Sequence, residues 1–150
     1  MRSLLYALVL SVLILFFSVS PLAVALGKDG AMPAQDREML TFRYAEFVGA
    51  FRGKNWNHVC TFVTDETKAG FGPGQMGCAG VKAVFAENEQ CWEDMLFALR
   101  QGCRISRSAE ACSSPPQLSD EVAHLGARAF FSYNKEDDLL KANSLICGGD

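Results

Sequence analysis

Six cysteines constrain the fold of this chain more than any other feature of its sequence. An even number of cysteines in an exported domain is typical of a disulfide framework. We therefore expect three disulfides, although the spacing of the cysteines leaves their pairing open. The six residues are Cys60, Cys78, Cys91, Cys103, Cys112 and Cys147.

A zinc site is the alternative use of these cysteines. Structural zinc sites often hold the metal between C-x-x-C pairs, and the sequence contains no such pair. Only His58 and His124 could add imidazole ligands. A catalytic thiol would leave an odd number of cysteines to pair. We predict disulfides, with no metal site and no cofactor.

The N-terminal segment has the layout of a secretory signal peptide. Arg2 is followed by an apolar run from Leu4 to Phe17, then by Pro21 and the small residues Ala23-Val24-Ala25. A basic start, an apolar stretch and small residues before the cleavage site mark such peptides. We predict that residues 1–25 are a signal peptide cleaved after Ala25. An uncleaved anchor is the alternative, because the uncharged stretch could span a bilayer.

Export would place the remaining chain in the periplasm or outside the cell, where disulfides persist. We expect residues 26–34 to form a linker and residues 35–150 to form one domain of ordinary size. The chain has 14 basic and 17 acidic residues, so it offers no evident basic surface for a nucleic-acid partner. Membrane contact is expected only through an uncleaved signal segment.

Three segments have the apolar spacing of three and four residues that predicts amphipathic helices. The first begins at Gln35 and is expected to end at Gly53, with that glycine in the left-handed conformation. Asn55 is expected to cap a second, shorter helix. A third helix is expected to begin at Asn88 and end at Gly102.

Two segments predict irregular structure. Residues 69–80 contain five glycines, and glycine this dense is costly to hold in a helix or strand. The segment lacks the G-K-[ST] ending of a phosphate-binding loop. Residues 104–117 are polar and include two adjacent prolines, which argue against a central strand there.

The last third of the chain changes to a two-residue period. Alternating apolar residues from Ala123 to Tyr133 predict a strand with one buried face. Residues 134–138 predict a charged turn, and Leu139 to Cys147 a returning strand, which together make a β-hairpin. Helices followed by a sheet indicate the α+β class.

Three short stretches resemble the NTF2-like superfamily. They are residues 51–60 (Phe-Arg-Gly-Lys-Asn-Trp-Asn-His-Val-Cys), residues 76–78 (Met-Gly-Cys) and residues 145–150. The resemblance covers residues 35–150 and implies N-terminal helices packed on a curved antiparallel sheet, a cone that often encloses a pocket. The pattern indicates only two strands, so either the cone is incomplete or further strands lie within residues 103–117.

The resemblance also suggests how the cysteines pair. It implies that a Cys60–Cys78 disulfide closes the glycine-rich loop onto the second helix. We expect Cys103–Cys112 to staple the polar segment and Cys91–Cys147 to tie the third helix to the last strand. Each of these disulfides would stabilise the fold by about 2–4 kcal/mol.

The superfamily includes isomerases, dehydratases and non-enzymatic binding modules, so the fold alone does not decide the function. No position matches a catalytic motif of those enzymes, and we predict no catalytic residue. Trp56 and Trp92 are candidate ligand-binding residues at a pocket rim, or else core residues. His124, Arg128 and Ser132 would project together from one sheet face, where they would bind an anion or polar ligand or face solvent.

His58 and Asp65 are close in the sequence, and a His–Asp pair can perform acid–base chemistry. The helical phase instead places His58 on the surface. We predict an exported, non-catalytic module that binds a protein or a small ligand through its sheet or pocket. A small-pocket isomerase or dehydratase, and a periplasmic inhibitor or immunity protein, are the alternatives.

Overall fold

The computed structural model describes residues 34–70, 75–117 and 126–148. They belong to one unit, Ala31–Asp150. The predicted signal peptide (residues 1–25), nearly all of the predicted linker and His124 lie outside the described residues. None of the described helices is long and apolar enough to cross a membrane.

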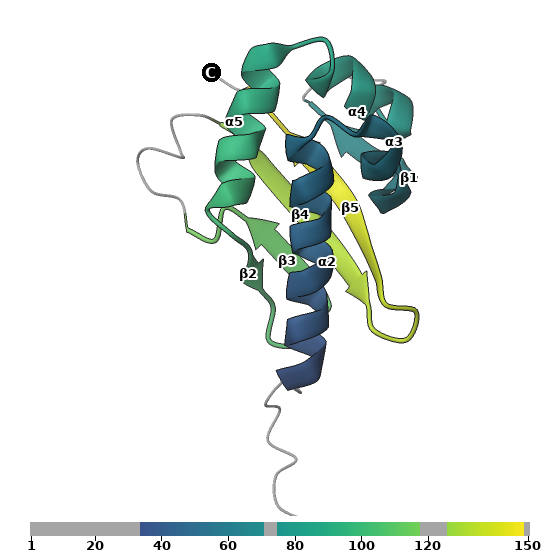
Figure 1. Cartoon of the computed structure of the whole chain (residues 1–150), viewed down its shortest axis with the longest axis vertical. Coiled ribbons are helices and arrows are strands. Elements are labelled where there is room, and N and C mark those ends of the chain that lie inside the picture. The colour runs from purple at the N-terminus through teal and green to yellow at the C-terminus, as the bar shows by residue number, and fades with distance from the viewer. Residues whose placement is uncertain (1–33, 71–74, 118–125, 149–150) are drawn as a thin grey trace, which may run out of the picture. The chain divides into compact units, whose positions relative to one another are not determined.

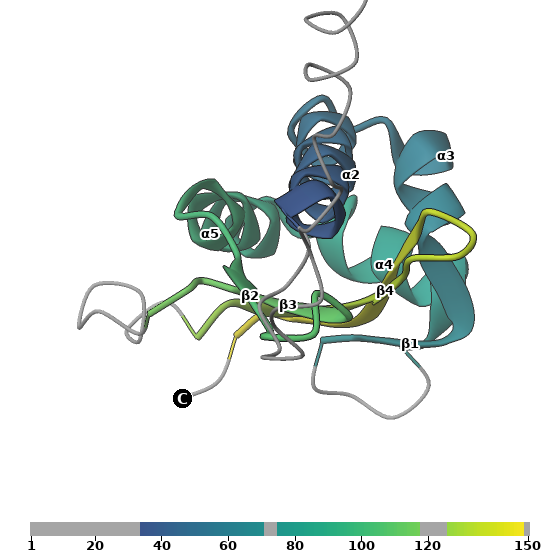
Figure 2. The same ribbon diagram turned by 90° about the horizontal axis from the view of Figure 1, so that it is seen from below.

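Helices lie on one side of a five-stranded sheet, so the fold belongs to the predicted α+β class (Figures 1 and 2). The strand order is β1-β5-β4-β3-β2. The helices are α2 (Ala34–Arg52), α3 (Trp56–Val59), the 3-10 turn η1 (Cys60–Phe62), α4 (Gly77–Phe85) and α5 (Glu89–Arg100). The strands are β1 (Val63–Ala69), β2 (Arg104–Ile105), β3 (Ala111–Ser114), β4 (Arg128–Asn134) and β5 (Leu139–Ile146).

The sheet is mixed, and the expectation of an antiparallel sheet is wrong at β1. This strand follows η1 and pairs in parallel with β5, the last strand, whereas the other neighbouring strands are antiparallel. The buried Thr67 secures the pairing, because its hydroxyl donates a hydrogen bond to the Ala142 carbonyl oxygen. A strand therefore lies between helices in the chain, and the helices and strands are not fully segregated.

Helix α2 ends at Arg52, and the left-handed residue that follows it lies one position later than the sequence predicted. Lys54, and not Gly53, takes the left-handed conformation, with φ of 51°. The Lys54 amide donates to Phe51 and the Asn55 amide donates to Ala50, which is the bond pattern of a Schellman motif. Gly53 still continues the helical hydrogen bonding by donating to Gly49, so it is the last residue before the turn.

The predicted Asn55 cap is confirmed, and Asn88, where a helix was expected to begin, also acts as a cap. The Asn55 side chain accepts a hydrogen bond from the His58 amide at the start of α3, and the Asn88 side chain accepts one from the Cys91 amide at the start of α5. Each cap satisfies an amide that the first turn of its helix leaves without an intrahelical partner.

The predicted loop at residues 69–80 is shorter than expected, because its last residues form the first turn of α4. Gly80 lies inside this turn and packs directly against the backbone before it. A Cβ atom on Gly80 would lie 2.5 Å from the carbonyl carbon of Gln75. This glycine therefore permits a close backbone approach within a helix and does not mark a loop.

The C-terminal β-hairpin is confirmed, but its first strand begins at Arg128 and not at Ala123, since Gly126 and Ala127 precede it outside the strand and residues 123–125 lie outside the described residues. Strand β4 pairs with β5 in antiparallel register, and Ala129, Phe131 and Tyr133 form its buried face. The polar segment 104–117 holds two further strands, β2 and β3, and β3 lies between β4 and β2. The expectation that the prolines exclude a central strand is wrong, since Pro115 and Pro116 follow the end of β3.

Tyr44 fixes β3 and α5 against the first helix. Its hydroxyl donates a hydrogen bond of 2.7 Å to the Leu99 carbonyl oxygen and lies 3.0 Å from Ser114 Oγ. The Ser114 hydroxyl in turn donates to the Ala98 carbonyl oxygen at 2.8 Å. Burial raises the pKa of Tyr44 to about 12. This buried polar contact holds the end of β3 that borders the candidate site described below.

Three disulfides join the elements, and their partners are those expected from the sequence. They are Cys60–Cys78, Cys91–Cys147 and Cys103–Cys112, with Cα–Cα distances of 5.2, 5.5 and 5.7 Å. The first joins η1 to α4, the second joins α5 to the residue after β5, and the third joins the segment before β2 to β3.

Candidate functional site

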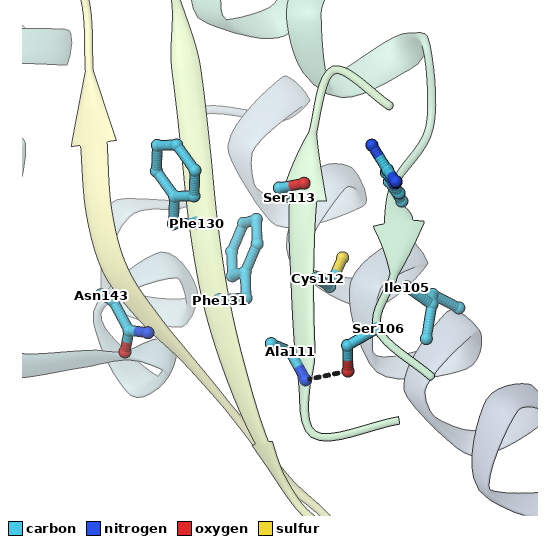
Figure 3. Close-up of a pocket in the computed structure, with 9 residues that line it drawn as sticks. Ile105, Ser106, Ala111, Cys112, Ser113, Phe130, Phe131 and Asn143 are labelled. Atoms are coloured by element: carbon cyan, nitrogen blue, oxygen red, sulfur yellow. Dashed lines mark hydrogen bonds between the residues drawn. The ribbon is translucent and has the colours of Figure 1, made fainter. Parts of the chain in front are cut away.

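The sheet face opposite the helices carries an exposed aromatic side chain, Phe130. Its residue is 41% exposed, and in the alternation of β4 it lies between Arg128 and Ser132. A hollow of about 360 Å³ opens beside it, lined among others by Ser113, Asn143 and Arg104 (Figure 3). Large aromatic residues are usually buried, so an exposed phenylalanine beside a hollow is informative.

Two further hollows adjoin the first. One of about 410 Å³ is lined by Phe130, Arg128, Arg104 and the residues that follow β3, including Pro115 and Pro116. The other, of about 420 Å³, includes Arg104, Arg37 and Gln117 in its lining. Because Arg104 lines all three, we treat them as one surface and call it the Arg104 groove.

The Arg104 groove is cationic in an acidic protein. Three arginines line it, one each from α2 (Arg37), β2 (Arg104) and β4 (Arg128). Within residues 34–70, 75–117 and 126–148, none of the three forms an ion pair, and no lining residue is acidic. Concentrated positive charge of this kind attracts anionic groups.

The structure brings together only some of the predicted site residues. Arg128 and Ser132 both lie on the outer face of β4, and Ser132 Oγ donates to Asn143 Oδ1 at 3.0 Å. The two tryptophans lie on the helical side. Trp92 Nε1 donates to the Phe51 carbonyl oxygen at 3.0 Å, and Trp56 packs edge-on against the Phe51 ring. Both tryptophans are partly buried against the core.

Sequence reasoning missed the residues at the centre of the groove. Phe130 has the same parity as Arg128 and Ser132, so the alternation of β4 already placed it on the outer face. No sequence pattern placed Arg104 on this face, because the polar segment around it has no regular spacing of apolar residues. Its place beside Phe130 depends on the pairing of β2 with β3.

His58 does not pair with Asp65. Its Nε2 atom lies 3.1 Å from Glu46 Oε1, and its ring stacks on Phe62. Glu46 also binds Arg43, so the histidine belongs to a surface network on α2 and α3. His58 therefore lies at the surface, as the helical phase predicted, with 40% of its side chain exposed.

The same network fastens the hairpin turn to α2. The Arg43 guanidinium donates to Asp138, and the Tyr133 hydroxyl donates to Asp138 Oδ1 at 2.8 Å. The hydrogen bond from Arg43, followed by that from Tyr133, lowers the pKa of the Asp138 carboxyl. Burial, followed by the hydrogen bond to Asp138, raises the pKa of Tyr133 to about 12.

The lowered pKa of Asp138 predicts acid sensitivity of this contact. A carboxyl with a lowered folded-state pKa stabilises the fold above its unfolded pKa, and loses that contribution as the pH falls through its folded pKa. We expect Asp138→Asn to lower the free energy of unfolding by about 1 kcal/mol at neutral pH, because the pair is partly exposed. Urea unfolding at neutral and acidic pH measures this, and the difference between variant and wild type should shrink in acid. If the difference in unfolding free energy between Asp138→Asn and wild type grew in acid, the lowered pKa of Asp138 would be contradicted.

The described residues hold no cluster of three or more His, Cys, Asp or Glu side chains suited to a metal ion. Comparison of the chain with family models, with curated proteins and with solved structures finds no match. Arginine, amide, hydroxyl and aromatic groups equip the Arg104 groove to hold an anionic and partly apolar ligand.

Proposed function

We propose that this protein is an exported, non-catalytic binding module of the NTF2-like type, and that it binds a protein partner through the Arg104 groove. The observation that carries the proposal is the exposed Phe130 between arginines on the uncovered sheet face. Aromatic residues and arginine are the side chains most enriched at protein–protein interfaces and at their energetic centres.

Export is supported by the disulfides and by the N-terminal segment together. Three disulfides suit an oxidising compartment, because cytosolic thiols are normally kept reduced. The segment 1–25 has the composition of a signal peptide. These two features are independent of each other, and both favour a periplasmic or extracellular location.

A binding role is favoured over a small-pocket enzyme by how the space between helices and sheet is filled. The rings of Phe47, Phe51 and Phe131 occupy it, and all three residues are at most 1% exposed. The two hollows beside Phe130 lie instead on the outer side, where a partner can reach them, and the third is lined by Arg104 of β2 and Arg37 of α2. An NTF2-like relationship is consistent with N-terminal helices packed on one face of the sheet.

Replacement of Phe130 tests the proposal. We expect Phe130→Ala to reduce capture of partner proteins in the source cell at least about ten-fold, because buried aromatic anchors dominate interface energies. Chemical cross-linking followed by purification of the tagged protein measures the capture. Phe42→Ala is the matched control, since Phe42 is 61% exposed on α2, on the helical side. Equal capture by both variants and by wild type would overturn the proposed function.

A further inference from the structure

We propose that the segment bound by the Arg104 groove is an acidic peptide, with carboxylates placed at the arginines and an apolar side chain against Phe130. This inference rests on the proposed function and specifies the chemistry of the partner. The charge, the side-chain types and the shape of the groove support it.

What distinguishes the groove is the gathering of three arginines on one surface, because several cations elsewhere, Arg52 and Arg100 among them, also lack an ion pair within the described residues. Arg43 pairs with Glu46 and Asp138, Lys54 with Glu89, and Lys135 with Asp36. The arginines of the groove have no such pairing among the described residues, although the chain has more acidic than basic residues. Three like charges around one surface raise the local positive potential, and an anionic ligand relieves that repulsion.

The cations of the groove are arginines, and arginine is better suited than lysine to bind carboxylate groups of a ligand. The planar guanidinium presents its N–H groups as a fork that matches a carboxylate with two parallel hydrogen bonds, whereas a lysine ammonium acts as a point charge. Arg104 and Arg128 line the same hollow from strands β2 and β4, with β3 between them. An acidic ligand can therefore be held at two points on either side of β3.

The shape of the groove favours an extended segment over a small molecule. Small-molecule sites are usually single concave pockets that bury most of the ligand. Here three open hollows of about 360, 410 and 420 Å³ share Arg104, two of them lined by strands β2, β3 and β4 and the third lined by Arg37 of α2 as well. Phe130 and the pair Pro115 and Pro116 offer apolar surface between the cations, and Ser113 and Asn143 offer hydrogen bonds to a peptide backbone.

The test uses the full oxidised protein and a fluorescently labelled peptide of glutamates with one central leucine. Fluorescence anisotropy should detect binding of this peptide, and should detect none for peptides in which lysine or glutamine replaces glutamate. Raising the salt from about 50 mM to about 500 mM should weaken binding, since exposed charge pairs are screened. Arg104→Gln and Arg128→Gln should each weaken binding about five-fold, which is the upper range for exposed ion pairs.

Arg52→Gln is the matched control, because Arg52 is an exposed arginine at the other end of α2 and should leave peptide binding unchanged. Equal binding by wild type and both groove variants would overturn the inference. Binding of inorganic phosphate or of a single-stranded oligonucleotide as tight as that of the peptide would overturn it as well. If the peptide fails while Phe130→Ala still abolishes partner capture, only the acidic chemistry is wrong. If the peptide does not bind and Phe130→Ala captures partners as well as wild type does, the proposed function is wrong too.

Discussion

Phe47→Ala should lower the free energy of unfolding by about 3–5 kcal/mol, the usual cost of removing a fully buried aromatic ring. Phe47 is 0% exposed. Its ring centroid lies 5.9 Å from that of Phe51, 5.5 Å from that of Phe62 and 4.9 Å from that of Phe131. One side chain thus joins α2, η1 and β4, and its loss would leave a cavity that three elements would have to collapse to fill.

Urea unfolding monitored by circular dichroism measures this effect. Phe42→Ala in the same helix is the control, and we expect it to change the unfolding free energy by less than about 0.5 kcal/mol because Phe42 is exposed. Phe47→Leu provides a graded variant with a smaller cavity, should the alanine variant fail to fold. A loss below about 1 kcal/mol for Phe47→Ala would mean that the aromatic cluster does not form the core.

Replacement of both Cys91 and Cys147 by alanine should have an effect of similar size, about 4 kcal/mol, which is the largest expected for any of the three disulfides. This bond closes a segment of 56 residues, whereas Cys103–Cys112 closes only nine. A cross-link stabilises mainly by restricting the unfolded chain, and a longer closed segment restricts it more. The double replacement of Cys103 and Cys112 should therefore cost less, about 3 kcal/mol.

The two double variants are compared by urea unfolding under non-reducing conditions. Each double variant leaves the other two disulfides in place. The difference between their losses of unfolding free energy therefore measures the effect of the length of the closed segment. A larger loss for the Cys103 and Cys112 variant would contradict the expected order. It would indicate that the Cys103–Cys112 disulfide also stabilises the folded state, by holding the segment before β2 against β3, and does not act only by restricting the unfolded chain.

Elements with strong periodicity and clear caps were predictable from the sequence. In α2, Leu40, Tyr44, Phe47 and Phe51 recur at helical spacing, and all of them are buried. In β4, alternate residues are buried as the two-residue period requires. The signal was strong in both cases because one face of the element meets the core along its whole length.

Strands β1 and β3 were not predictable in this way. In β1 only Thr67 and Ala69 are buried, and the strand lies at the edge of the sheet, so its sequence is mostly polar. In β3 the buried residues are Cys112 and Ser114, which are small, and one is a serine satisfied by Tyr44 and Ala98. Neither strand has a run of large apolar side chains that would mark it in the sequence. Both strands are stabilised mainly by hydrogen bonding to neighbouring strands, which depends on tertiary context.

The candidate site was predictable only in part for a related reason. Arg128 and Ser132 were placed on the outer face because the period of β4 extends along a single strand. The Arg104 groove also needs Arg37 and Arg104, which come from separate elements. Their proximity follows from tertiary pairing, which no local pattern encodes.

The parallel pairing of β1 with β5 also affects the order in which the molecule can be assembled. Val63 pairs with Ala142, so the partner of β1 is synthesised only after all the described helices and the other strands. The helices between them can form as the chain emerges, and Cys60 and Cys78 are close enough in sequence to be oxidised early. Strand β1 lacks its partner until β5 has been made, and Cys91 lacks its partner until Cys147 has been made. Contacts between such distant parts of a chain form slowly. The sheet therefore cannot be completed before β5 has been synthesised, and a chain truncated before β5 would leave β1 without its parallel partner and Cys91 as an unpaired thiol.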